Sequence, residues 1–170
     1  MPDDPSAGMT DAQLVALVQG SPLVHFTGFV TIEDKDHKRI MLNGQEGNGL
    51  PNILQRRIAE AYDWCIENGI PARLMVLKPR QKGSSTFTGH LCYHHARRFH
   101  CDGMIIGDEG SRTEKAWQIF TDYSRNDTFP WDSRVKFNTE KCTFTYKDGS
   151  KGLWERDTAN DPKAGIGGTR

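Results

Sequence analysis

Near the middle of the chain, an apolar stretch runs into a loop of cations, one glycine and three hydroxyl side chains. Residues 74–86 read Leu-Met-Val-Leu-Lys-Pro-Arg-Gln-Lys-Gly-Ser-Ser-Thr. In the phosphate-binding motif G-x-x-x-x-G-K-[ST], backbone N–H groups cradle the phosphates, a lysine reaches their terminal oxygens and a hydroxyl holds Mg²⁺. With Gly83 at the second glycine of this motif, Ser85 takes the magnesium position. The stretch therefore predicts a phosphate-binding loop with Ser85 as its metal ligand.

The match to this motif is partial. Ser84 stands where the motif has its lysine, and Lys78 stands where the motif has its first glycine. The positive charge that phosphates require would have to come from Lys78, Arg80 or Lys82, and the sequence leaves the choice among them open. A surface turn with solvated cations is the alternative interpretation of the loop.

The segments on both sides of the loop predict the order strand, loop, helix that such a loop requires. Residues 72–77 are mostly apolar and follow a glycine and a proline, as expected for a buried parallel strand. Residues 85–99 carry apolar and aromatic side chains at intervals of four, which predicts a helix. A helix that begins at Ser84 or Ser85 would direct its free backbone N–H groups at a bound phosphate.

Length and composition limit the class of protein. The chain has 170 residues, enough for about one domain. Lys plus Arg and Asp plus Glu each number 22, so any contact with DNA must be local or lie outside this chain. The four cysteines show no paired spacing, which suits a reducing cytosol. We find no leader peptide and no apolar stretch near the about 18 residues of a membrane span, so we expect a soluble intracellular protein.

Residues 1–50 are predicted to form an N-terminal arm. Thr10 and Gln13 fit a capping box at the start of a short helix. Residues 29–34 and 39–42 fit the two strands of a β-hairpin. The arm thus consists of a helix and a hairpin that precede the domain with the phosphate loop.

A longer helix is predicted for residues 51–68, and Gln55 lies near its start. A side-chain amide can both donate to and accept from the edge of an adenine base. Gln55 is therefore a candidate reader of the base. A solvated helix residue without a binding role is the alternative.

After the loop helix, residues 103–107 fit a second buried strand, and Ser111 with Glu114 fits a capping box for the next helix. The order strand, helix, strand, helix implies a parallel sheet with right-handed crossovers. Residues 143–146 and 152–155 flank an Asp-Gly turn, which predicts a hairpin. The predicted fold class is α/β, with a P-loop NTPase-like parallel sheet flanked by helices and with β-hairpin additions.

Asp108 and Glu109 follow the apolar residues 104–107, and ATPases use such a pair to hold Mg²⁺ and activate water. This strand is the first after the loop helix, however, and a glycine interrupts its apolar run. We therefore favour a turn at the end of the strand that caps the next helix.

Cysteines and histidines gather at the end of the loop helix, at Cys92, His94, His95, His100 and Cys101. Such side chains can bind zinc, but their spacing matches no common zinc module. We favour a packed helix with one histidine-bearing, solvated side, and a cytosolic metal-binding protein remains the less favoured alternative.

In their order along the chain, these motifs resemble the N-terminal ATPase region of the large terminase subunit, the motor protein of tailed phages. Residues 78–86 are similar to that family's phosphate loop, K-x-R-Q-x-G-x-S, and residues 157–170 to its segment T-A-x-x-x-x-A-G-R-G. Gln55 sits where the family keeps its adenine-reading glutamine. The resemblance covers about residues 29–170. The sequence departs from the family pattern at Ile166, where the family usually has arginine. The family's acidic strand, coupling motif and nuclease domain would follow residue 170.

The resemblance implies that residues 51–170 are the N-terminal part of a P-loop ATPase domain that uses ATP and Mg²⁺. It implies ATP-driven translocation of double-stranded viral DNA into a procapsid in the cytoplasm of a bacterial host. The portal of the procapsid and the small terminase subunit would be its partners. The alternative is a truncated, non-hydrolysing nucleotide-binding or interaction module. Unpaired sheet edges would favour self-association in either case.

The loop residues take separate roles in this interpretation. Lys78 and Arg80 are the expected catalytic residues, with Arg80 acting as an arginine finger on the transferred phosphoryl group. Gly83 would let the backbone approach the phosphates. The residues expected to bind the nucleotide are Gln55, Lys78, Arg80, Gln81, Lys82, Gly83, Ser84, Ser85 and Thr86. Because only Ser85 is available to hold Mg²⁺, we expect this chain alone to hydrolyse ATP negligibly.

Overall fold

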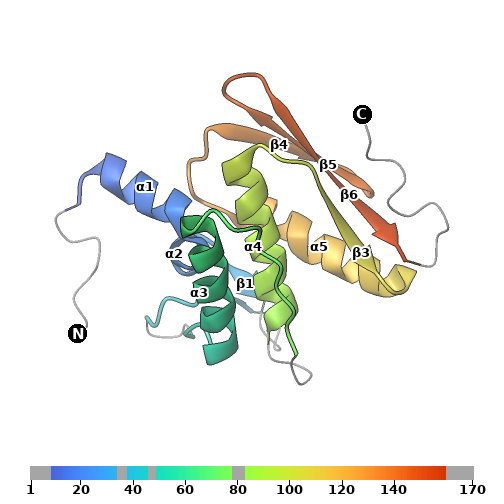
Figure 1. The fold of residues 1–170 in the computed structure, drawn as a ribbon, viewed down its shortest axis with the longest axis horizontal. Helices are drawn as coiled ribbons and strands as arrows, with labels where there is room; N and C mark the ends of the chain where they lie inside the picture. Colours follow the sequence, from blue (N-terminus) through green and yellow to red (C-terminus); the bar gives the residue numbers. More distant parts are fainter. Residues whose placement is uncertain (1–8, 34–37, 46–48, 78–82, 160–170) are drawn as a thin grey trace.

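The computed structural model describes residues 9–33, 38–45, 49–77 and 83–159. Figure 1 shows a group of helices beside a twisted sheet, with α4 and α5 between them. In chain order the elements are α1 (Asp11–Gly20), α2 (Pro22–Gly28), β1 (Ile32–Glu33), β2 (Arg39–Ile40), α3 (Ile53–Glu67), α4 (Ser84–Phe99), β3 (Gly103–Gly107), α5 (Gly110–Asn126), β4 (Ser133–Phe137), β5 (Lys141–Tyr146) and β6 (Lys151–Thr158).

Local capping signals explain where the first helices begin. The Thr10 hydroxyl accepts from the Gln13 N–H and the Gln13 side chain accepts from the Thr10 N–H, so the predicted capping box of α1 is confirmed. Asn52 and Gln55 form the same reciprocal pair at the start of α3. The sequence does not predict α2, which begins at a proline directly after the capping hydroxyl of Ser21.

The start of α5 differs from the prediction. Glu109 is its N-cap residue and makes no capping hydrogen bond through its side chain. The predicted capping box of Ser111 with Glu114 is wrong, because Ser111 lies within the first turn and donates to the Glu109 carboxylate at 3.2 Å. Both Asp108 and Glu109 pair with Arg112, the latter at 3.1 Å. The acidic pair thus forms the exposed turn between β3 and α5.

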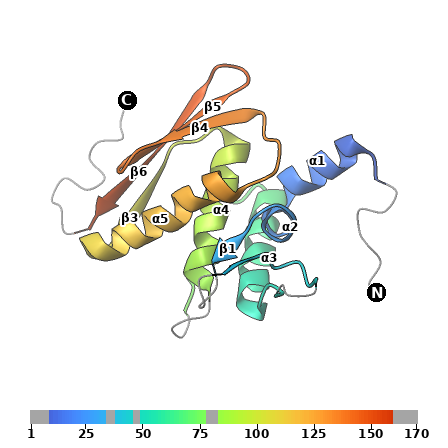
Figure 2. The same cartoon turned by 180° about the vertical axis from the view of Figure 1, so that it is seen from behind.

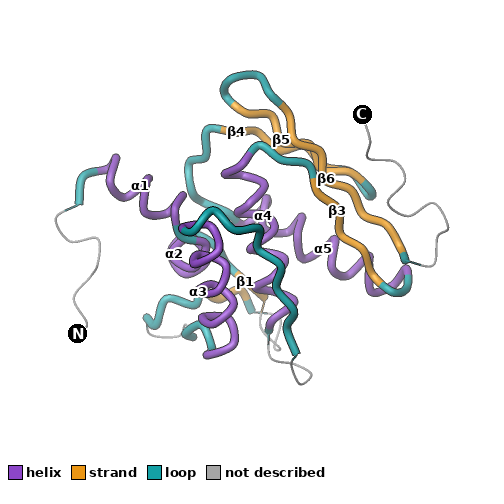
Figure 3. The backbone as a smooth tube through the Cα atoms, in the orientation of Figure 1, coloured by secondary structure: helices purple, strands orange, loops and turns teal. Residues whose placement is uncertain are grey.

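A four-stranded sheet has the order β3-β6-β5-β4 (Figure 3). β3 runs parallel to β6, with Gly103 opposite Trp154, and the other neighbours are antiparallel. The predicted hairpin of residues 143–146 and 152–155 is confirmed within β5 and β6, and its turn holds Gly149 at φ 83°. The α/β class is confirmed, but the described sheet is mixed, with one parallel pair, where the sequence predicts a parallel sheet.

Residues 72–77 do not form the predicted buried strand. Within the described ranges, this segment has no strand partner, and its side chains are exposed. β3 takes β6 as its parallel neighbour instead. An apolar run becomes a strand only where a neighbouring strand accepts and donates its backbone hydrogen bonds, and the run itself does not supply that neighbour.

An aromatic-rich core joins the N-terminal arm to α3, α4, α5 and the sheet. Phe120 of α5 stacks on Trp154 of β6, and Tyr93 of α4 contacts both Phe120 and Phe144. The arm contributes buried side chains to the same cluster, including Phe26. Figure 2 shows the opposite side of the molecule, where α5 crosses α4. None of the helices that the structure describes is long and apolar enough to cross a lipid bilayer.

Candidate functional site

The start of α4 has backbone N–H groups without an acceptor in the described part of the chain. Gly83 is its N-cap residue in the left-handed conformation, with φ 64° and ψ 11°, and no side chain caps the helix. The first intrahelical hydrogen bond runs from the Phe87 N–H to the Gly83 carbonyl at 3.1 Å. The N–H groups of Ser84, Ser85 and Thr86 therefore have no acceptor within the helix. These groups and the helix dipole together favour an anion at this end.

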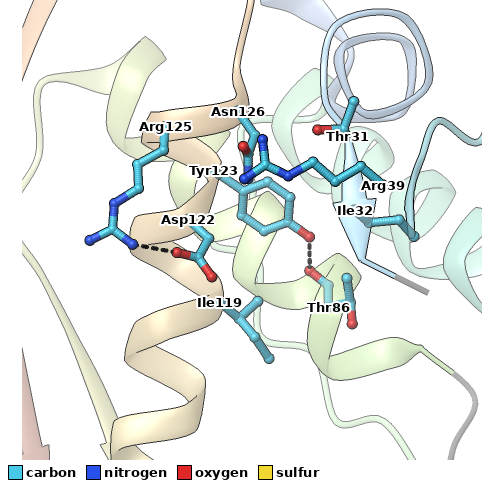
Figure 4. A pocket seen from close by; sticks show the side chains of 9 residues that line it. All are labelled: Thr31, Ile32, Arg39, Thr86, Ile119, Asp122, Tyr123, Arg125 and Asn126. Carbon is cyan, nitrogen blue, oxygen red and sulfur yellow. Dashed lines mark hydrogen bonds and ion pairs between the residues drawn. The ribbon is translucent and has the colours of Figure 1, made fainter. Parts of the chain in front are cut away.

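The three hydroxyl side chains of this turn differ in accessibility. Ser84 is buried, Thr86 is half-buried and Ser85 is exposed. The Thr86 carbonyl accepts a hydrogen bond of 2.8 Å from the Tyr123 hydroxyl, which ties the first turn of α4 to α5 (Figure 4). Ser85, the predicted metal ligand, is thus the hydroxyl of the turn that solvent reaches most readily.

Gln55 contacts the start of α4 although it belongs to α3. Its Nε2 donates to the Gly83 carbonyl at 3.3 Å, and its Oε1 accepts from the Asn52 N–H at 2.9 Å. The side chain is buried, so both ends of the amide are occupied by the protein. The tertiary structure brings together the two motifs that the sequence singles out. Reading adenine would require Gln55 to exchange these hydrogen bonds for contacts with the base.

Four of the predicted site residues lie outside the described residues. They are Lys78, Arg80, Gln81 and Lys82. The structure thus places Gln55, Gly83, Ser84, Ser85 and Thr86 in one region, whereas the predicted cations of the loop have no described position.

A cavity of about 220 Å³ opens beside the first turn of α4 (Figure 4). Arg39 reaches from β2 across this cavity toward Asn126, while Arg125 of α5 is held by Asp122 at 2.6 Å. Thr86 joins the cavity to the start of α4. The described lining thus holds two guanidinium groups and one carboxylate, and that carboxylate pairs with Arg125. The full lining comprises Thr31, Ile32, Arg39, Thr86, Ile119, Asp122, Tyr123, Arg125 and Asn126.

Sequence reasoning misses Arg39 as a residue of the site. The hairpin pattern predicts a strand around it, and β1 and β2 confirm an antiparallel pair with Glu33 opposite Arg39. Local alternation indicates two faces of a strand but does not say which face meets α5.

A second polar cluster is fully buried between α2, α4 and the residues after α5. His25 Nε2 lies 3.0 Å from Asp127 Oδ1, and His25 Nδ1 lies 2.9 Å from His90 Nε2. His94 Nε2 lies 3.0 Å from the Val18 carbonyl oxygen. If Asp127 is ionised, it accepts from His25, His25 accepts from His90, and His94 donates to Val18. These side chains link the N-terminal arm to α4.

The environment of this cluster favours neutral imidazoles. Burial lowers the pKa of His94 to about 3 and the pKa of His90 well below its ordinary value. Burial alone would raise the pKa of Asp127, but hydrogen bonds from His25 and Tyr93 help to hold that pKa below its ordinary value. The imidazoles of His90 and His94 are therefore neutral at pH 7, and they lie beside the contact between His25 and Asp127.

His95 and His100, near the end of α4, contact different partners. His95 Nδ1 lies 2.5 Å from the Tyr62 hydroxyl. The His100 ring stacks on Tyr146, with ring centroids 3.6 Å apart. Across the described ranges, no group of three or more His, Cys, Asp or Glu side chains is placed to hold a metal ion.

Comparison of the chain with protein-family models, with curated proteins and with solved structures found no match.

Proposed function

We propose that this chain is the ATP-binding portion of a large terminase subunit, the motor that drives double-stranded viral DNA into a procapsid. The observation that carries the proposal is the start of α4, which no side chain caps and where Gly83 has the left-handed conformation; the cation-rich residues 78–82 precede it in the sequence. Free helix N–H groups behind a cationic loop are suited to phosphate. The contact between Gln55 and the Gly83 carbonyl supports the proposal, because it joins two separate motifs at one place.

In the proposed complex, the phosphates lie against the backbone N–H groups of residues 83–86. Ser85 binds Mg²⁺ through its exposed hydroxyl. Lys78 and Lys82 neutralise the phosphates, and Arg80 stabilises the charge that develops on the transferred phosphoryl group. The P-loop NTPase fold, the bacterial cytoplasm, the portal and the small terminase subunit belong to the same proposal.

The test is a titration of isotopically labelled protein with Mg·ATP, followed by NMR. The backbone amides of residues 83–86 should show the largest shifts, because they are the proposed phosphate ligands. Ser85→Ala should weaken binding in the presence of Mg²⁺ more than in its absence. Thr88→Ala removes another exposed hydroxyl one turn further along α4 and should leave binding unchanged. Shifts confined to other parts of the chain would refute the proposed site.

The second candidate is a nucleotide-binding or interaction module that does not hydrolyse ATP. It is favoured by Arg112, which pairs with both Asp108 and Glu109, so that a metal ion would have to displace a guanidinium group to reach them. We expect steady-state ATPase activity near background, unchanged in Asp108→Ala and Glu109→Ala. Robust turnover that disappears in either variant would make this pair catalytic.

A further inference from the structure

A cavity of about 450 Å³ lies at the end of α4 that is remote from Gly83. It is lined by residues from the last turns of α1 and α4, the start of β4 and the turn between β5 and β6. Figure 1 shows this turn close to the upper end of α4. Every lining residue lies more than ten positions along the chain from any residue outside the described ranges. The cavity is thus separate from the start of α4, where the phosphate site is proposed.

Arg97 is a half-buried cation in the wall of this cavity. Its Nε donates to the Tyr93 hydroxyl at 2.9 Å, and its Nη1 donates to the Ser133 carbonyl at 2.7 Å and to the Ser133 hydroxyl at 2.8 Å. The guanidinium carbon lies 5.2–5.9 Å from the centroids of three aromatic rings, those of Tyr93, Phe144 and Trp131. These contacts hold the cation in one position against the side of α4.

Among the described residues, no carboxylate forms an ion pair with Arg97, and its Nη2 has no hydrogen-bond partner. Asp127 is connected to Arg97 through the Tyr93 hydroxyl, which donates to Asp127 Oδ2 at 2.9 Å. A cation that is partly removed from water is stabilised by an anion in direct contact with it. Arg97 therefore has both the charge and the Nη2 donors to bind an anion that enters the cavity.

The other charged groups of the lining leave a small positive excess. Arg98 and Lys147 add two cations to Arg97, and Asp132 and Asp148 are the two carboxylates. With histidine neutral, three cations and two carboxylates give a net charge of +1. A monoanion balances this charge, whereas the dianion of a phosphate ester exceeds it.

Aromatic rings form much of the uncharged lining. Trp131 is half-buried, and its Nε1 donates to Asp127 Oδ2 at 2.7 Å, which fixes the indole. The ring of His100 stacks on Tyr146, which also lines the cavity. Flat rings that are partly open suit a planar apolar body, because stacking buries apolar surface.

We propose that this cavity binds a small, planar molecule with a single carboxylate, of the class of aromatic acids. Nη2 of Arg97 would donate to the carboxylate, while Arg98 and Lys147 would add positive charge around it. The planar body would pack against Trp131. The volume of the cavity is in the range of small-molecule pockets. The proposal goes beyond nucleotide binding and does not depend on it.

The test is an NMR titration of the full chain with naphthoate, without nucleotide. The indole N–H of Trp131 and the Nε–H of Arg97 should show saturable shifts that fit one-to-one binding. Naphthamide keeps the rings and the shape of naphthoate but has no charge, so it should bind about tenfold more weakly or worse. Equal affinity for the acid and the amide would overturn the proposal in favour of an apolar site. Absence of saturable shifts at these two groups would refute it.

Two lysine substitutions form a matched pair. Lys147→Gln should weaken naphthoate binding about two- to fivefold, because one exposed cation of the lining is lost. Lys115→Gln removes an exposed lysine of α5 outside the cavity and should leave the affinity unchanged. Identical affinities of these two variants would overturn the assigned role of Lys147 and with it the site.

Arg97→Gln should weaken naphthoate binding about tenfold or more, because the anion loses its principal partner. The comparison of acid with amide needs no variant, so it tests the charge even where Arg97→Gln does not fold. Inorganic phosphate and a single-stranded DNA oligonucleotide serve as competitors. Tighter binding of inorganic phosphate at the same two N–H groups would overturn the proposal in favour of a phosphate site. Tighter binding of the oligonucleotide there would overturn it in favour of a nucleic-acid surface.

Discussion

Gln55 is the residue at which two helices meet. Its Oε1 completes the capping box of α3, and its Nε2 donates to the carbonyl of Gly83 at the start of α4. An exposed glutamine would leave both groups to solvent. Because this side chain is buried, removal of the amide leaves the Asn52 N–H and the Gly83 carbonyl without these partners.

We predict that Gln55→Ala lowers the free energy of unfolding by about 1–2 kcal/mol, from the lost cap and the lost contact with Gly83. Gln55→Glu keeps the acceptor for the Asn52 N–H but sets a buried carboxylate oxygen against the Gly83 carbonyl oxygen, so it should also lower the free energy of unfolding. Urea unfolding measures both. If Gln55→Ala leaves stability unchanged but discriminates less well between ATP and GTP, then Gln55 reads the base and has no capping role. If Gln55 acts by positioning α4, the variant should lose affinity for ATP and for GTP equally.

At the scale of the element, the start of α4 depends on a left-handed glycine. Gly83 has φ 64° and Gly69, after α3, has φ 63°. A Cβ at Gly83 would lie 3.1 Å from Gln55 Nε2, whereas nothing lies within 4 Å of a Cβ at Gly69. The two glycines share a backbone conformation and differ in their surroundings.

Gly69→Ala should therefore cost only the strain of a left-handed alanine, about 1 kcal/mol. Gly83→Ala should cost more, because Gln55 must also move. Thermal unfolding compares the two variants. The extra loss of stability in Gly83→Ala, relative to Gly69→Ala, should disappear when Gly83→Ala is combined with Gln55→Ala, as a double-mutant cycle would show. Equal costs in all backgrounds would mean that the Gln55 contact contributes nothing.

The pairing of β3 with β6 depends on close packing at Gly103. A Cβ there would meet three atoms of the Trp154 ring at 2.5–2.6 Å. Since an indole ring is rigid, Gly103→Ala should lower the free energy of unfolding by about 1–3 kcal/mol and change tryptophan fluorescence. Gly110→Ala is the control, since a Cβ there has no neighbour within 4 Å and alanine favours the first turn of α5. Similar effects of both substitutions would contradict this account of the strand pair.

At the scale of the whole molecule, the buried histidines connect parts that are distant in sequence. His25 of α2 contacts both His90 of α4 and Asp127 after α5, and His94 contacts the last turns of α1 through Val18. The N-terminal arm is therefore joined to the rest of the chain by polar contacts as well as by the core. These contacts hold while His90 and His94 are neutral.

We predict that acid destabilises the whole fold. The unfolded histidines have a pKa of about 6.5, and the folded values of His90 and His94 are lower. Between pH 6.5 and the lower folded values, the unfolded state binds more protons, so stability falls as pH falls, by about 1.4 kcal/mol per pH unit for each histidine. The lowered pKa of Asp127 acts in the same direction at pH values below about 4.

Urea unfolding between pH 7 and pH 5 measures this dependence. His94→Gln keeps an N–H donor for the Val18 carbonyl but does not titrate, so its stability should fall less steeply with acid. Identical slopes for the parent and His94→Gln would rule out His94 as a source of the dependence.

The sequence by itself determined the features whose partners are a few residues apart. The capping box of Thr10 with Gln13, a strand at residues 103–107 and the hairpin around Gly149 all follow from local patterns and are confirmed. The predicted burial of that strand is wrong, because β3 lies at an edge of the described sheet and its Ile106 is 53% exposed. Such signals are reliable because the groups that satisfy them lie within one turn of helix or one tight turn. The same locality limits them, since the proposed cap at Ser111 was equally plausible in sequence and is wrong.

Only the tertiary structure decided which distant residues meet. It placed Gln55 on the Gly83 carbonyl, brought Arg39 over the cavity beside Thr86, and gathered His25 with His90 around Asp127. It also left residues 72–77 without a strand partner in the described part of the chain, although their composition is that of a buried strand. Pairing and burial depend on which elements become neighbours, and a local sequence pattern fixes the faces of an element but not the surface that covers them.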